Sequence, residues 1–222
     1  MKAVMVIAAH TDDEAIGCGG TIARHVAAGD AVHVVFMADG VTSRAQADTA
    51  GLQQRHAAAE QAHAVLGIAG AHHLGFPDNR LDSVALLDVV QPLEQIIRAV
   101  RPEIVYTHHS GDLNVDHQIT HQAVMTACRP QPGFPVREIL AFEVMSSTEW
   151  TGCAQLPFVP DVFIDIDAFW ERKRKALEAY ALEMRDFPHS RSIEHMDILA
   201  RHRGACVGVA RAEAFKLIRS LR

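Results

Sequence analysis

The N-terminal stretch MKAVMVIAAHTDDE (residues 1–14) decides the fold that we expect for this chain. Residues 2–9 form a continuous apolar run, which is typical of a parallel strand buried on both faces. The polar string HTDDE (residues 10–14) follows at once, and residues 15–28 then have the composition of a helix. A strand that passes through a short polar turn into a helix is the repeating unit of an open α/β sheet.

The same alternation continues to about residue 128, which predicts a mostly parallel sheet flanked by helices. Further strands are predicted at residues 31–37, 71–74, 104–107, 139–145 and 162–166, and a loop at residues 39–51. Further helices are predicted at residues 52–66, 85–100, 119–127, 169–185, 194–204 and 211–221. Pro92 predicts a break or kink in its helix. No repeat or low-complexity linker divides the chain, so we predict a single α/β domain over residues 1–222.

Composition and charge exclude several classes of protein. Hydrophobic residues make up 49% of the 222 residues, which is enough apolar surface for a packed core. The formal net charge is -6 and no basic stripe is present, so nucleic acid is not an expected partner. No apolar run resembles a membrane span or a signal peptide, which predicts a cytoplasmic protein without membrane insertion. The cysteines lack CxxC spacing and are expected to be free thiols: Cys18, Cys128, Cys153 and Cys206.

Two polar segments each follow the end of a predicted parallel strand. The first is residues 10–14, and the second is residues 108–117, which reads HHSGDLNVDH. In open α/β sheets, ligands bind just outside the carboxyl ends of the strands. We therefore expect the two segments to lie side by side in the sheet and to form one site.

The residue types in these segments suit a catalytic zinc ion. Such an ion takes His nitrogen and carboxylate oxygen from three protein ligands and leaves one position for water. His10, Asp13 and His117 are the candidate ligands, and Asp12 is then free to act as a general base on water. The same acidic residues are also good chemistry for a helix N-terminus. The spacing alone leaves the metal site and the simple helix start both open.

The motifs resemble those of the PIG-L/LmbE-like deacetylases. The string A-H-T-D-D-E, followed by G-C-G-G-T, is similar to the first signature of that family, which usually reads A-H-P-D-D-E. Residues 112–117 (DLNVDH) resemble its second motif, which ends in Asp-His. Matching stretches continue along the chain at residues 55, 66–67, 76–78, 187–192 and 212–215. The resemblance implies a Rossmann-like fold and zinc-dependent removal of an N-acetyl group from a small-molecule amino sugar, in an enzyme that often forms homo-oligomers.

The resemblance also implies roles for single residues. The three candidate ligands map to the family's ligands of Zn²⁺, with other divalent transition metals as alternatives, and Asp12 maps to its general base. Arg55 and Asp78 map to positions that bind the sugar. Arg55 suits a hydroxyl or a phosphate, and Arg44 adds charge suited to a nucleotide diphosphate. Both arginines are equally compatible with surface salt bridges.

The main departure from the family pattern is Asn114. Some members carry at this position a His that acts as an acid or an electrostatic stabiliser. An Asn amide can donate a hydrogen bond to an oxyanion but cannot deliver a proton at neutral pH. Asp12 is then expected to serve as base and acid in turn, unless His108 or His109 folds inward to reach the substrate. Asp116 is expected to orient a neighbouring side chain.

Two rival functions remain open from the sequence. One is a different zinc amidohydrolase that acts on another sugar conjugate. The other is a non-catalytic protein that binds a sugar nucleotide, in which the acidic segment only caps a helix. Zinc analysis separates the enzyme from the binding protein, whereas the acetylated substrate is not readable from the sequence.

Overall fold

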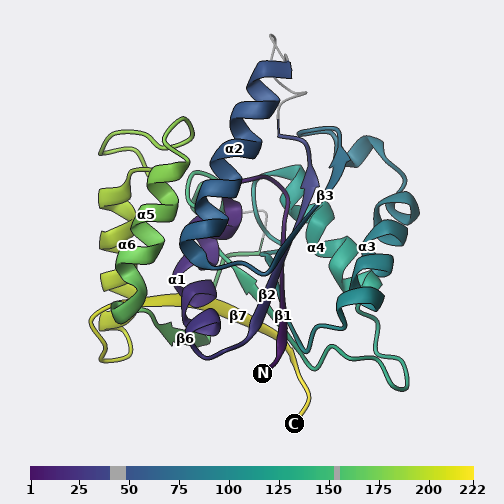
Figure 1. Cartoon of the computed structure of the whole chain (residues 1–222). Helices are drawn as coiled ribbons and strands as arrows, with labels where there is room; N and C mark the ends of the chain where they lie inside the picture. Colours follow the sequence, from purple (N-terminus) through teal and green to yellow (C-terminus); the bar gives the residue numbers. More distant parts are fainter. Residues whose placement is uncertain (41–48, 153–155) are drawn as a thin grey trace.

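The centre of the molecule is a seven-stranded sheet with the order β3-β2-β1-β4-β5-β7-β6 (Figure 1). The computed structural model describes residues 1–40, 49–152 and 156–222. Its strands are β1 (Ala3–Ala8), β2 (Ala31–Ala38), β3 (Gly70–Phe76), β4 (Ile104–His108), β5 (Glu138–Phe142), β6 (Val162–Asp165) and β7 (Ala212–Ser220). The pairs from β3 to β5 are parallel, and β7 runs antiparallel to both β5 and β6. This confirms the predicted α/β class with a mostly parallel sheet.

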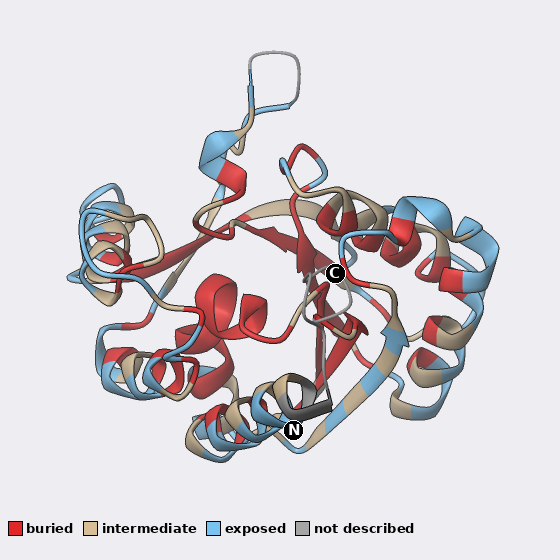
Figure 2. Cartoon of the chain, turned by 90° about the horizontal axis from the view of Figure 1, so that it is seen from above, coloured by how far each residue is buried: buried red, intermediate tan, exposed pale blue. Residues whose placement is uncertain are grey.

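Helices cover both faces of the sheet, and each face has its own apolar core (Figures 1 and 2). The helices are α1 (Asp13–Ala27), α2 (Thr49–Leu66), α3 (Leu86–Val100), α4 (Val115–Ala127), α5 (Trp170–Ala179) and α6 (Ile193–Ala205). Short 3-10 turns lie at Leu81–Ser83, Thr148–Trp150 and Asp167–Phe169. Residues of α1, α2, α5 and α6 pack on one face, and residues of α3 and α4 pack on the other. The central strands β1, β2, β4 and β5 are mostly buried, as their apolar runs predict, whereas the edge strands β3 and β6 are partly exposed.

The prediction of a C-terminal helix over residues 211–221 is wrong. The segment is the strand β7, which lies between β5 and β6 and pairs with both. A short apolar run with interspersed charges fits a strand or a helix about equally well, so only its neighbours decide. The predicted helix over residues 169–185 is also too long, because α5 ends at Ala179 and the chain then turns.

The expected break at Pro92 is absent, since α3 runs from Leu86 to Val100 through it. The break lies instead in α1, at Cys18, whose φ of -146° is not helical. The N–H groups of Gly20 and Thr21 that follow the break donate to the carboxylate of Glu213, at 2.9 and 2.7 Å. Lys173 donates to Glu213 at 2.6 Å and to the carbonyl oxygen of Ile16 at 2.7 Å. A buried ion pair from α5 and β7 therefore satisfies the backbone groups that the break exposes.

Glycines in the GCGG run allow α1 to approach the sheet closely. A Cβ atom at Gly17 would lie 2.4 Å from the ring of Phe142, and one at Gly20 would lie 2.8 Å from Ile166. Side chains at these positions would push the helix away from the strands. The site residues at the start of α1 depend on that close contact for their position.

Three remaining predictions concern the chain as a whole. In the described part of the chain, no helix is long and apolar enough to cross a membrane. The described cysteines Cys18, Cys128 and Cys206 are free thiols, whereas Cys153 lies outside the described residues. Most of the predicted loop over residues 39–51, with Arg44, also lies outside them.

Candidate metal centre and active site

The strand order places the two polar segments next to each other. β1 pairs with β4 in the middle of the sheet, with Val4 opposite Ile104 and Val6 opposite Tyr106. The chain leaves β1 into α1, which packs on one face of the sheet, and β4 leads into α4, which packs on the other face. The carboxyl ends of both strands therefore open at the point where the strand order reverses, which is where such sheets bind ligands.

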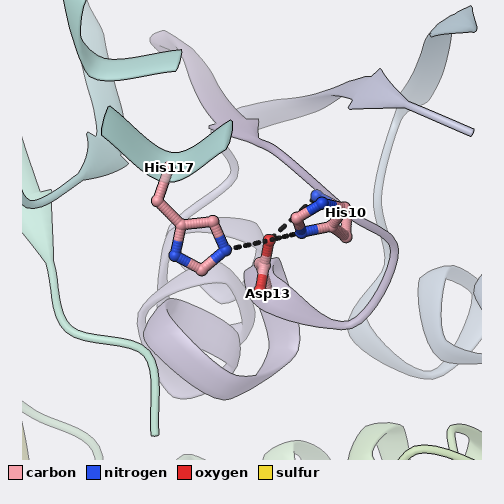
Figure 3. A group of neighbouring side chains, drawn as sticks. All are labelled: His10, Asp13 and His117. Atoms are coloured by element: carbon pink, nitrogen blue, oxygen red, sulfur yellow. Dashed lines mark hydrogen bonds and ion pairs between the residues drawn. The ribbon is translucent and has the colours of Figure 1, made fainter. Parts of the chain in front are cut away.

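Three side chains from these segments converge there (Figure 3). Oδ2 of Asp13 lies 3.3 Å from Nδ1 of His10 and 3.4 Å from Nε2 of His117. Donor atoms bonded to zinc at about 2.0–2.1 Å in tetrahedral geometry would lie about 3.3–3.4 Å apart. The three residues form a group that could hold a metal ion, and their spacing and donor types fit zinc.

Each histidine of this group has a carboxylate at its other ring nitrogen. Nε2 of His10 lies 3.1 Å from Asp116 and 3.1 Å from Asp78, and Nδ1 of His117 lies 3.1 Å from Asp112. A carboxylate at one nitrogen holds the proton there, so that the opposite nitrogen presents its lone pair. Nδ1 of His10 and Nε2 of His117 are therefore the ring nitrogens that face Asp13 and would be offered to a metal ion. Asp78 and Asp116 could form a second metal-binding group with His10. Because both contact Nε2, and not the nitrogen that faces Asp13, we assign them to the support of the His10 ring.

Asp112 supports His117 and was missed as a site residue by the sequence reasoning. Its carboxylate is fully buried and accepts hydrogen bonds from the hydroxyls of Ser147 and Thr148. Burial alone raises the pKa of Asp112, but His117 and the two hydroxyls outweigh it and lower the pKa to about 2. Its place at the start of the DLNVDH motif was the available signal, but its contact partners come from residues 147–148 and could not be read from that motif.

Asp12 occupies a strained turn between β1 and α1. Its φ is 118°, which a side-chain-bearing residue rarely adopts, and its N–H donates to Glu14 Oε2 at 3.1 Å. Glu14 is itself held by the hydroxyl of Tyr180 at 2.6 Å. The side chain of Asp12 makes no capping hydrogen bond to α1 and instead contacts Nη1 of Arg191 at 2.9 Å. The acidic string therefore does more than start a helix.

Burial and charge shift the pKa values of this cluster in different directions. Burial raises the pKa of Asp12 to about 6, although Arg191 opposes the shift. Burial also favours neutral Asp13, but the His117 imidazole outweighs it and holds the pKa of Asp13 well below its usual value. Burial lowers the pKa of His117, whereas Asp13 and Asp112 raise it more strongly, to about 9. Asp13 is therefore anionic, as a metal ligand would need to be, while Asp12 can exchange a proton near neutral pH.

A polar cavity of about 230 Å³ lies beside the three candidate ligands. Its lining consists of His10, Asp12, Gly40, Arg55, Asp78, Asn79, Asn114 and Arg191. This volume is small for a drug-sized ligand and suits one sugar-sized unit. The two predicted sugar-binding residues are thus both at the cavity, where Arg55 is held by Glu183 at 2.7 Å.

Three other predicted residues have unexpected partners. Asn114 lines the cavity, but its amide oxygen accepts the N–H of Asp116 at the start of α4 and its amide nitrogen donates to Asn79. Nε2 of His109 lies 2.9 Å from the carbonyl oxygen of Leu156, and His109 is not part of the cavity lining. His108 accepts the N–H of Ala9 through Nε2, so that nitrogen is not available to a metal or substrate.

The family model described as PIG-L, GlcNAc-PI de-N-acetylase, matches residues 5–128 of the chain. The chain belongs to the PIG-L family. This chain is 34% identical over 185 residues to the uncharacterized deacetylase YaiS of Escherichia coli. The match covers 81% of this chain and 90% of YaiS. Membership in this family of amide-bond hydrolases confirms the enzyme class predicted from the sequence.

Two further comparisons concern a related sequence and a solved structure. The chain is 27% identical over 189 residues to a 4-oxalmesaconate hydratase of Pseudomonas putida, covering 81% of this chain and 73% of that protein. Its structure is similar to N,N'-diacetylchitobiose deacetylase from Pyrococcus horikoshii, with a TM-score of 0.79, 22% identity, and coverage of 98% and 84% of the two chains. That second similarity establishes the fold.

Proposed function

We propose that this PIG-L enzyme removes the N-acetyl group from an N-acetylglucosamine-type amino sugar and releases acetate. The observation that carries the proposal is the convergence of three possible metal-binding atoms, one each from His10, Asp13 and His117. Asp12 and His10 also line a cavity of the size of one sugar. The deacetylases among its relatives support the reaction type.

His10, Asp13 and His117 would hold the metal, for which we propose Zn²⁺. When bound, the ion would polarise the acyl oxygen and lower the pKa of a water molecule. The chain's own contribution is to keep two neutral imidazoles and one carboxylate in fixed positions. The carboxylates behind the two rings would maintain the tautomers that binding requires.

Asp12 would move the proton in both halves of the reaction. It would accept a proton from water as the water oxygen bonds to the acyl carbon, and the negative charge would move to the acyl oxygen. It would then return the proton to the nitrogen as the C–N bond breaks, which gives acetate and a free amine. A pKa of about 6 suits both transfers near neutral pH.

Arg55 and Asp78, which both line the cavity, would bind hydroxyl groups of the sugar. The almost entirely polar lining favours a hydroxylated ring over an apolar acyl chain in that space. Asn79 and Asn114 add amide groups to the cavity lining, and the hydrogen bond between them orients these groups. We also propose that the protein is located in the cytoplasm and assembles into a homo-oligomer.

The test is an acetate-release screen with added zinc over N-acetylglucosamine, its glycosides, and its lipid- and nucleotide-linked forms. Asp12→Asn should abolish acetate release while about one metal per chain remains bound. Asp88→Asn, which removes an exposed carboxylate from α3, is the matched control and should keep full activity. Loss of metal from Asp12→Asn would mean that Asp12 is a ligand, and the assigned roles would be wrong.

The similarity to a hydratase gives a second candidate, namely addition of water to an unsaturated carboxylic acid. This reaction would also need a metal and a base, and the two arginines of the cavity would have to release their present acidic partners to bind carboxylates. Loss of ultraviolet absorbance of such an acid, with no acetate from any amino sugar, would favour the hydratase. Binding of a sugar nucleotide without metal or turnover would favour the non-catalytic alternative.

A further inference from the structure

A deacetylase needs a hydrogen-bond donor or cation that faces the acyl oxygen as negative charge develops on it. The residues expected to supply it have other partners. The amide of Asn114 is engaged with Asp116 and Asn79, His109 is turned to Leu156, and His108 accepts the N–H of Ala9. Another residue of the cavity lining must therefore supply this donor.

Arg191 also lines the cavity and lies in the segment between α5 and α6. Its Nη1 lies 2.9 Å from Oδ2 of Asp12. A water molecule activated by Asp12 lies one hydrogen bond from that carboxylate, and the acyl carbon lies next to the water. A guanidinium in contact with the same carboxylate is therefore within reach of the acyl oxygen.

The guanidinium is held in place before any substrate arrives. Nε of Arg191 donates to Oγ of Ser146 at 2.6 Å, and the backbone of Ser146 has the unusual φ of 67°. The N–H of Arg191 donates to Nδ1 of His189 at 3.0 Å, and its carbonyl accepts the N–H of Arg185. A donor fixed in this way costs little reorganisation during the reaction.

Arg55, the other cation of the cavity lining, is less suited to this task. Its Nη2 is bound to Glu183, and its contacts among the described residues include none with the Asp12 carboxylate within ion-pair distance. Lys173 is buried in the break of α1 with Glu213 and does not line the cavity. The position beside the reacting atoms thus singles out Arg191.

We propose that Arg191 is a catalytic residue, whose guanidinium holds the Asp12 carboxylate in the resting enzyme and stabilises the negative charge on the acyl oxygen during attack. The inference rests on the proposed deacetylation. No proton leaves Arg191 in this step, because the water proton goes to Asp12 and the guanidinium contributes charge and hydrogen bonds only. The same contact would keep Asp12 oriented toward the water.

The experiment compares Arg191→Ala and Arg191→Lys with the zinc-loaded wild type, using the best substrate of the acetate-release screen. We expect kcat of Arg191→Ala to fall by about 100- to 1,000-fold, with a smaller loss for Arg191→Lys. KM should change by less than about threefold, since the contact strengthens in the transition state. Arg185→Ala, which removes an exposed cation of the same segment bound only to carbonyl oxygens, should keep wild-type kinetics.

Added ethylguanidinium should restore at least about tenfold of the lost kcat to Arg191→Ala and none to Asp12→Asn. Metal content should match the wild type, and circular dichroism should show that each variant is folded at the assay temperature, which separates catalysis from folding. An unchanged kcat, a rise in KM alone, or failure of rescue in a folded, metal-loaded variant would each overturn the proposal. A wild type that releases acetate from no substrate would instead remove the proposed function, and this inference with it.

Discussion

The ion pair in the break of α1 offers a stringent test of how the site is held. In Glu213→Gln the side chain keeps its shape but loses its charge, so Lys173 stays buried without a counter-ion. The amide also cannot accept hydrogen bonds at both positions, so one of the N–H groups of Gly20 and Thr21 loses its acceptor. Both losses act at the helix that carries the candidate ligand Asp13.

The expected magnitude follows from the burial of both charges. Removing one partner of a buried ion pair costs about 3–5 kcal/mol, because the other charge remains desolvated. For a chain of this size, that loss lowers Tm by about 6–20 °C. The exposed pair between Asp161 and Lys216, which lies on β7 like Glu213, should contribute less than about 1 kcal/mol.

Urea denaturation followed by circular dichroism measures this difference. Glu213→Gln should lower the midpoint without changing the slope, whereas Lys216→Gln should hardly move it. Adding Lys173→Met to Glu213→Gln should recover part of the loss, since the unpaired charge is removed. If Glu213→Gln costs no more than Lys216→Gln, the buried pair does not hold the break and the reasoning is refuted.

Three further predictions concern the metal and the pH. Asp112→Asn should weaken metal affinity by about 10- to 100-fold in a chelator competition, because His117 loses the negative charge that holds the proton at its Nδ1; an unchanged affinity would contradict this. His117 has a pKa of about 9 and is therefore protonated at pH 7. Metal binding should release close to one proton from it, and metal affinity should rise from pH 7 to pH 9. Calorimetry in buffers of different ionisation enthalpy measures the number of protons released. Burial lowers the pKa of His63 to about 4, so its neutral form stabilises the fold above its unfolded pKa, and stability should fall as pH drops from about 6.5 to 4; His63→Phe should reduce that slope in denaturation curves.

The core of the sheet could be predicted because its strands are buried on both faces. The run over residues 2–9 and the Val-rich β2 permit few other structures, and the polar ends of β1 and β4 mark the ligand-binding edge. β7 could not be predicted in the same way. Its strand character depends on β5 and β6, which lie on either side of it and come from distant parts of the chain.

The same contrast holds within the candidate site. The motifs carried the three metal-binding candidates and Asp12, because these residues stand in two short segments with recognisable spacing. Arg191 and the support of Asp112 by Ser147 were not assigned, since each meets its partner across a long sequence separation. The roles expected for Asn114 and His109 changed because each forms a hydrogen bond with a residue of another loop, Asn79 and Leu156 respectively.

The sequence by itself determined the fold class, the family and the residues able to bind a metal, because burial patterns and short motifs are local properties of the chain. Only the tertiary structure decided that the segment from His10 to Glu14 divides its contacts among His117, Arg191 and Tyr180. Which carboxylate meets a metal ligand, a cation or a hydroxyl depends on where other segments lie when the sheet and helices have packed. That arrangement turns an acidic helix start into a candidate active site.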